Sequence, residues 1–206
     1  RPPPSSTLFP YTTLFRSRLW DPDEGSILLD GTDIRSFPLA ALRSTIQPIH
    51  QDVFLFSRTI RENITLGLDI PEETVVRAAK AAQAHDFITA LPEGYETVLH
   101  EGAVNISSGQ RQLLSFARII AHDPPVLILD EATSSIDTET EKLVQKALKT
   151  VLKNRTAVVI AHRLSTIRSA HRIYVLAGGR IIEEGSHREL LSRGGTYHSL
   201  YKLQMK

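Results

Sequence analysis

The fold of this chain is indicated most directly by residues 126–131, which read VLILDE. A continuous apolar run followed by two carboxylates is typical of a strand that is buried on both faces of a parallel sheet. The carboxylates would then lie at the carboxyl edge of the sheet, where α/β proteins bind ligands. Asp130 and Glu131 are therefore candidate site residues, with a helix N-cap at Asp130 and Glu131 in the first helical turn as the alternative interpretation.

The segment that follows completes a strand-helix-strand unit. Apolar residues recur with a helical period between Glu139 and Leu152, and residues 156–160 form another apolar run, TAVVI, that we expect to be buried on both faces. Such a unit joins parallel strands by a right-handed crossover. The remaining sequence predicts a hairpin at Asp30 and Gly31, a helix that starts near Pro71, a hairpin on the sheet edge at residues 173–182, and a polar, helical C-terminal segment.

A second candidate site precedes the first of these strands. Residues 105–111 read NISSGQR and open a segment with helical periodicity, so Ser107 can cap a helix while Gln110 completes a capping box. Free amides at a helix start also suit phosphate, and Ser107 with the Gly109 amide could form an anion site. A capped helix is the simpler interpretation of this motif alone, but its position shortly before Asp130 favours the anion site.

Together with three further motifs, these segments resemble the nucleotide-binding domain of an ATP-binding cassette (ABC) transporter, from about residue 18 to residue 206. The five motifs follow the family's order: Gln51 in HQDVFLF (50–56) for the Q-loop, ISSGQ (106–110) for the signature, VLILDE (126–131) for Walker B, SSID (134–137) for the D-loop, and His162 in IAHRLS (160–165) for the switch histidine. The signature has Ser108 where the family usually has glycine.

The resemblance implies an α/β fold of the P-loop NTPase (RecA-like) type. Its parallel sheet core would carry an inserted α-helical subdomain at about residues 58–120, within a partial ABC ATPase domain at residues 18–206. No G-x-x-x-x-G-K-[ST] motif occurs, so we expect the P-loop strand and helix to be missing and apolar surface beside residues 126–129 to be uncovered. Residues 1–17 contain TLFPYTTLFRS, which resembles a translated sequencing adapter, and we expect them to be an unstructured assembly artefact.

The resemblance also implies roles for individual residues, with ATP and Mg²⁺ as the bound groups. Glu131 would polarise the attacking water, His162 would bind the γ-phosphate, and Gln51 would contact both Mg²⁺ and the water. Asp130 would hold Mg²⁺ through its water shell. The residues implied to contact nucleotide, partly across a dimer interface, are Ser107, Ser108, Gly109, Gln110 and Asp137.

The implied partners are a second nucleotide-binding domain, identical or different, and a transmembrane domain at the cytoplasmic face of a membrane. Residues 56–63 and Glu101 resemble exporters whose transmembrane helices come first in the same polypeptide, although His100 and Gly102 stand where the family commonly has Gly and Arg. The parent would hydrolyse ATP to drive transport, while the chain without a P-loop would be inactive. A non-catalytic regulatory or scaffold half is an alternative function.

Composition excludes other classes of function. With 24 basic and 23 acidic residues the net charge is +1, so no bulk field favours nucleic acid, and only 56 positions without heptads separate Gln51 from Ser107, too few for the coiled coil of a DNA-repair or chromosome ATPase. The absence of cysteine excludes disulfides and thiolate zinc sites. Apolar residues make up 41% of the chain, but their runs fall short of the ~20 residues of a membrane helix, so we expect the chain itself to be soluble.

Overall fold

The computed structural model describes residues 22–50, 53–131, 137–161 and 164–204. Contacts divide the chain into two compact units, which meet in the sequence between Val159 and Ile160. Up to the boundary the elements are β1 (Leu28–Leu29), β2 (Thr32–Asp33), η1 (Ile34–Ser36), α2 (Leu39–Thr45), β3 (Ile46–Ile49), α3 (Ile60–Thr65), α4 (Glu72–Ala81), α5 (His85–Thr89), η2 (Gly94–Glu96), η3 (Glu101–Ala103), α6 (Ser108–His122), β4 (Val126–Glu131) and α7 (Thr138–Leu152). Strand β5 (Thr156–Ala161) crosses the boundary. It is followed by α8 (Leu164–Ser169), β6 (Ile173–Ala177), β7 (Arg180–Gly185), α9 (His187–Arg193) and α10 (Thr196–Gln204).

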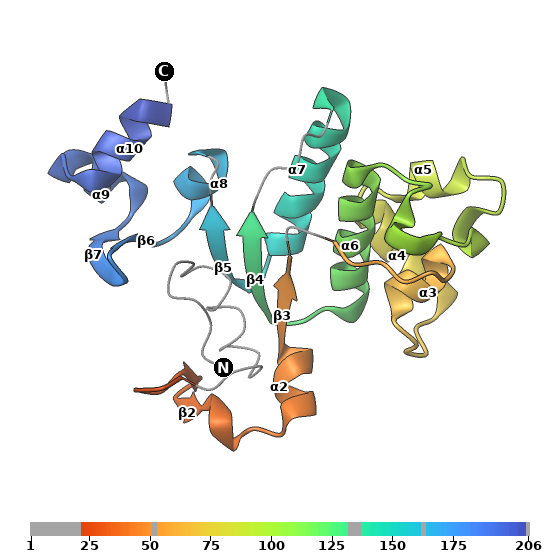
Figure 1. Cartoon of the computed structure of the whole chain (residues 1–206), viewed down its shortest axis with the longest axis horizontal. Coiled ribbons are helices and arrows are strands. Elements are labelled where there is room, and N and C mark those ends of the chain that lie inside the picture. The colour runs from red at the N-terminus through yellow and green to blue at the C-terminus, as the bar shows by residue number, and fades with distance from the viewer. Residues whose placement is uncertain (1–21, 51–52, 132–136, 162–163, 205–206) are drawn as a thin grey trace. The chain divides into compact units, whose positions relative to one another are not determined.

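A three-stranded sheet in the order β3-β4-β5 forms the centre of the larger unit. Strands β3 and β4 are parallel, with Ile46 opposite Val126 and Ile49 opposite Leu129, and the three arrows in Figure 1 point the same way. Helix α7 joins β4 to β5, which confirms the predicted strand-helix-strand unit. Pro48 is tolerated in β3 because this strand has a neighbour on one side only in the described sheet.

Strand β4 is buried on both faces, as its sequence predicts. Leu127 and Leu129 are buried in the large core that includes α6 and α7, whereas Ile128 packs on the opposite face with Ile34 and Leu42. Successive side chains of a strand point to opposite faces, so one apolar run supplies two cores. Leu127, Ile128 and Leu129 are themselves at most 2% exposed, so the expected uncovered apolar surface does not lie on these residues of β4.

Strand β5 departs from the prediction that it is buried on both faces. Val158 is 38% exposed and Thr156 is also exposed, while Ala157 and Val159 on the alternate positions pack against the core. The sequence of β5 is as apolar as that of β4. Its burial is lower because the cluster of Ile34, Leu42 and Ile46 that covers Ile128 of β4 does not include Val158.

Helices α3, α4, α5 and α6 form a helical region beside the sheet, on the right in Figure 1, and they share the large core with β4. Helix α6 packs against α3, α4 and α7. Helix α4 begins after Pro71, as predicted, because proline cannot donate the amide hydrogen that a first helical turn leaves free. Helix α3 begins with a capping box between Thr59 and Glu62.

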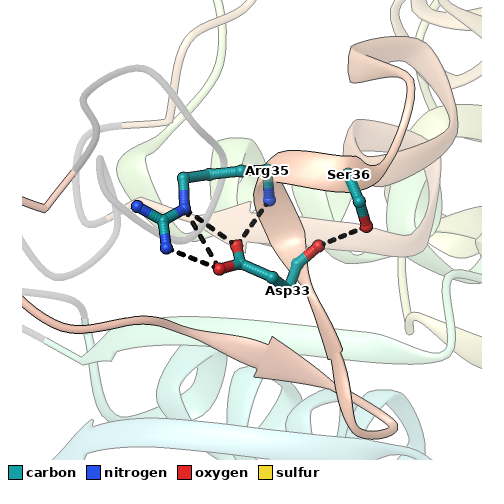
Figure 2. A network of polar contacts seen from close by, with 3 residues as sticks. All are labelled: Asp33, Arg35 and Ser36. Carbon is teal, nitrogen blue, oxygen red and sulfur yellow. Dashed lines mark hydrogen bonds and ion pairs between the residues drawn. The ribbon is translucent and has the colours of Figure 1, made fainter.

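The N-terminal hairpin of the larger unit also forms as predicted. Strands β1 and β2 pair around Gly31, which has a φ of 80° that glycine adopts without strain. Asp33 then caps η1: its carboxylate accepts the Arg35 amide at 2.9 Å and pairs with the Arg35 guanidinium at 2.6 Å, and its carbonyl accepts the Ser36 hydroxyl at 2.7 Å (Figure 2). This network fixes the exit from the hairpin.

The described part of the smaller unit contains α8, the β6–β7 hairpin and then helices α9 and α10. The hairpin is confirmed, but its strands pair only with each other among the described residues, so it is not the expected extension of the parallel sheet. Val175, Leu190 and Tyr197 form its core. Glu183 caps α10 by accepting the amides of Thr196 at 2.6 Å and Tyr197 at 3.1 Å, and these bonds lower the pKa of its carboxyl.

Candidate functional site

The predicted catalytic positions follow the three strands of the parallel sheet in chain order. Gln51 comes shortly after β3, Asp130 and Glu131 end β4, and His162 directly follows β5. Since β3, β4 and β5 are neighbours and run the same way, all three ends lie at one edge of the sheet (Figure 1). Gln51 and His162 themselves lie outside the described residues.

The end of β4 resolves one alternative left by the sequence. Asp130 and Glu131 continue the strand rather than starting a helix, and α7 begins only at Thr138. The interpretation of Asp130 as a helix N-cap is therefore wrong. Asp130 is partly buried at the strand end, a position from which a carboxylate can bind a cation.

Magnesium places modest demands on a protein site. It keeps most of its water and is usually held by one or two carboxylates together with substrate phosphates. Within the described ranges no group of three or more metal-binding side chains occurs. A single strand-end carboxylate such as Asp130 fits magnesium bound with a nucleotide.

The signature segment forms the start of α6 as the sequence predicts. Ser107 is the N-cap: its hydroxyl accepts the Gln110 amide at 3.2 Å, and the Gln110 side chain accepts the Ser107 amide at 2.9 Å. This capping box leaves the amides of Ser108 and Gly109 without an acceptor within the helix, because the first turn of a helix has none. The capped helix and the anion site are therefore compatible: the Ser107 hydroxyl can still donate its own hydrogen.

The residues around the signature hold it in place, and sequence reasoning missed two of them. Arg111 donates to the carbonyls of Ile106 at 3.2 Å and Ala103 at 3.4 Å. Asn105 accepts the His100 amide at 3.2 Å and donates to the Val98 carbonyl at 3.1 Å. Both residues lie within residues 105–111, NISSGQR. A side chain that hydrogen-bonds to the backbone leaves no periodic pattern in the sequence, so the motif did not predict these bonds.

Asp137 is the exposed N-cap of α7. Its carboxylate accepts the Thr140 amide at 2.9 Å, and this backbone hydrogen bond lowers the pKa of Asp137. The alternative interpretation of this residue as a capping aspartate is thereby confirmed as geometry. A role across a dimer interface stays a prediction.

No helix in the described part of the chain is long and apolar enough to cross a lipid bilayer. The longest helices are α6 and α7, with 15 residues each, and both carry polar faces. A spanning helix needs ~20 largely apolar residues.

Comparison with known proteins identifies the family. The ABC transporter profile matches residues 11–134. The chain is 54% identical over 188 residues, 91% of its length, to an ATP-dependent lipid A-core flippase of Desulfotalea psychrophila, and 54% identical over 189 residues to the uncharacterized ABC transporter ATP-binding protein YknV of Bacillus subtilis. It covers 33% and 31% of those proteins, so it spans about a third of the length of the relatives it matches.

A solved structure of an ABC exporter also resembles this chain. The structure of a bacterial Atm1-family ABC exporter with ATP bound superimposes with a TM-score of 0.88 at 40% identity, covering 98% of this chain and 36% of the exporter. Its likeness confirms the predicted P-loop NTPase fold with a parallel sheet. The strand ends, the capped signature helix and these matches lead to one conclusion: the chain belongs to the ABC transporter family.

Proposed function

We propose that this chain is the ATP-binding and ATP-hydrolysing domain of an ABC exporter, placed at the cytoplasmic face of a membrane. The observation that carries the proposal is the row of three adjacent parallel strands that lead into Gln51, Asp130 with Glu131, and His162. The likeness to an ATP-bound exporter supports the same function.

In this proposal each strand end supplies a separate chemical group. Asp130 holds Mg²⁺, which when bound neutralises charge on the phosphates. Glu131 accepts a proton from the attacking water, His162 hydrogen-bonds the γ-phosphate, and Gln51 orients the water. In this proposal Glu131 takes up the proton, whereas Mg²⁺ and His162 stabilise the charge on the phosphates.

The signature helix would act on a second ATP-binding domain. Ser107 and the Ser108 and Gly109 amides at the start of α6 can donate to the γ-phosphate of an ATP molecule held by that domain, with Gln110 keeping the helix start in shape. Asp137 would contact the partner from the start of α7. ATP then closes the dimer, and hydrolysis reopens it.

The rest of the parent protein would contain the transmembrane domain. The chain spans about a third of its relatives, one of which is a flippase, and the ATP-bound structural relative is an exporter. We infer that a transmembrane domain in the same polypeptide precedes this domain and that Gln51 transmits its movement. Nucleic acid is not a partner in this proposal.

The test uses the full-length protein that contains this domain. Glu131→Gln should keep Mg-ATP binding and lower phosphate release by at least ~10², because an amide cannot accept the proton of water. Glu139→Gln, on the exposed first turn of α7, is the matched control and should retain the wild-type rate. Turnover of Glu131→Gln within about tenfold of wild type would exclude Glu131 as the base, whereas a wild-type protein that binds but does not hydrolyse Mg-ATP would favour the regulatory or scaffold alternative.

The chain without a P-loop is proposed to bind ATP weakly and not to hydrolyse it. Most phosphate affinity in this type of fold comes from the P-loop amides and lysine, and the sequence contains no such motif. Calorimetry with Mg-ATP should give no micromolar binding for the 206-residue chain. A version in which residues 1–17 are replaced by a family-like strand and P-loop should gain it.

A further inference from the structure

The segment of residues 53–58, between Gln51 and α3, has no regular secondary structure. Leu55 is buried, but Phe54 and Phe56 point away from the core, 68% and 44% exposed, with their rings edge to face at 4.9 Å. Leu55 and the partly buried Val53 are thus its main apolar contacts with the core. The position of the segment must depend strongly on polar contacts.

Asn63 of α3 provides the first set of these contacts. It is 1% exposed, its side-chain oxygen accepts the Phe56 amide at 2.8 Å, and its amide group donates to the Phe56 carbonyl at 2.9 Å. The same amide group also donates to the carbonyls of Arg58 at 3.3 Å and Thr59 at 3.0 Å. One buried side chain therefore uses both its donors and its acceptor on the backbone of this segment and the start of α3.

Arg118 of α6 provides the second set. Its Nε donates to the Asn63 carbonyl at 2.9 Å, and both Nη atoms donate to the Phe54 carbonyl at 3.3 Å. The planar guanidinium thus connects the residue that holds Phe56 with the backbone of Phe54. Burial lowers the pKa of Arg118, as expected for a cation whose water has been replaced by backbone carbonyls.

The two ends of this connection are held in different ways. Helix α6 is fixed by the apolar core through residues such as Leu113, Leu114 and Phe116, which are almost fully buried. Removing the Arg118 guanidinium should leave α6 and its N-terminal Ser107 in place. The segment of residues 53–58, in contrast, would lose its bond to α6.

We propose that Asn63 and Arg118 are positioning residues that hold the segment after Gln51 against the signature helix, so that movement of a transmembrane partner at this segment reaches α6. The proposal rests on the function proposed above and adds the two residues that would carry the coupling. The exposed pair Phe54 and Phe56 is the surface whose orientation these residues fix.

The test measures turnover and coupling separately in the full-length protein. Phosphate release from Mg-ATP reports turnover, and the change that Mg-ATP causes in the distance between two spin labels in the transmembrane domain reports coupling. For Arg118→Met we expect turnover within about threefold of wild type and loss of the distance change. Arg118→Lys keeps the charge without the fork and should restore part of the change.

Arg155→Met is the matched control for loss of a buried arginine. Its side chain is 10% exposed and bonds Asp123 and the Val151 carbonyl, away from residues 53–58. It should retain both readouts. A normal distance change in Arg118→Met, or equal loss of turnover and distance change, would overturn the positioning role, whereas failure of the wild-type protein to hydrolyse Mg-ATP would refute the proposed function instead.

Amide hydrogen exchange in the same protein tests the contact itself. In Arg118→Met the Phe56 amide should exchange at least ~10-fold faster, while amides in the middle of α6 keep their protection. Unchanged exchange at Phe56 would show that Asn63 alone holds the segment, and the proposal for Arg118 would fail.

Discussion

Strands β4 and β5 are neighbours in one parallel sheet and have similarly apolar sequences, VLILDE and TAVVIA, yet the structure buries them to different degrees. Leu127, Ile128 and Leu129 of β4 are at most 2% exposed, while Val158 of β5 is 38% exposed. The difference arises on one face of the sheet, since Ile34 and Leu42 pack against Ile128 of β4, whereas Val158 of β5 belongs to neither core cluster of the larger unit. An apolar run thus indicates a buried strand, but the elements that pack on each face of the sheet decide how much of the run is covered.

Among the changes that test this difference in burial, a truncation in β4 should have the largest effect on stability. Leu127→Ala removes a fully buried side chain from the large core and should lower the free energy of unfolding by about 3–5 kcal/mol, because the cavity cannot collapse between packed helices. Urea denaturation of the purified protein measures the loss. A cost below ~1.5 kcal/mol would mean that β4 is less tightly packed than the structure shows.

The loops that precede the two strands give the second prediction. Arg155, next to the start of β5, pairs with Asp123, which ends α6 just before β4, and the Thr156 amide donates to the Pro125 carbonyl at 3.0 Å. Arg155→Met should cost about 2 kcal/mol of unfolding free energy, since it removes hydrogen bonds from a charged, nearly buried group. Asp123→Asn is the matched variant and should cost less, because Asp123 is 80% exposed.

A smaller effect is expected for the matched truncation in β5. Val158→Ala should cost about 1 kcal/mol, because the side chain is partly solvated before it is removed. The same urea titration compares it directly with Leu127→Ala. Equal costs for the two variants would contradict the difference in burial between the strands.

The smallest effect should come from Asp137, the cap of the helix that joins the strands. Asparagine caps helices as well as aspartate, so Asp137→Asn should barely change stability at neutral pH. Because hydrogen bonding lowers the pKa of Asp137, the stability that its charge contributes is present above the unfolded-state pKa and is lost as the pH falls through the lower folded-state pKa. Wild type should therefore lose stability relative to the variant only below about pH 4. If wild type and variant stayed equally stable below about pH 4, the charge of Asp137 would not contribute to stability.

The same substitution tests the interface role in the full-length protein. If Asp137 acts only as a cap, Asp137→Asn should leave ATP-driven dimerisation unchanged, as measured by sedimentation in the Glu131→Gln background. Loss of dimerisation with unchanged stability would support contact with the partner domain.

The sequence by itself determined the elements and the family. The apolar run before Asp130, the capping box of Ser107 and Gln110, and the turn at Gly31 depend on contacts between residues close in the chain, and all are present as expected. The order of the motifs likewise predicted the ABC transporter family, which the family match confirms.

Only the tertiary structure decided which elements contact one another and how deeply each is buried. It settled Asp130 as a strand residue, left β5 half covered, and showed that Arg118 of α6 bonds the backbone of Asn63 and Phe54, 55 and 64 residues earlier in the sequence. Burial and backbone hydrogen bonding of this kind depend on partners brought together by folding, and no local pattern records them. The family of this chain could therefore be predicted from its motifs, whereas the contacts between the segments that carry those motifs required the fold.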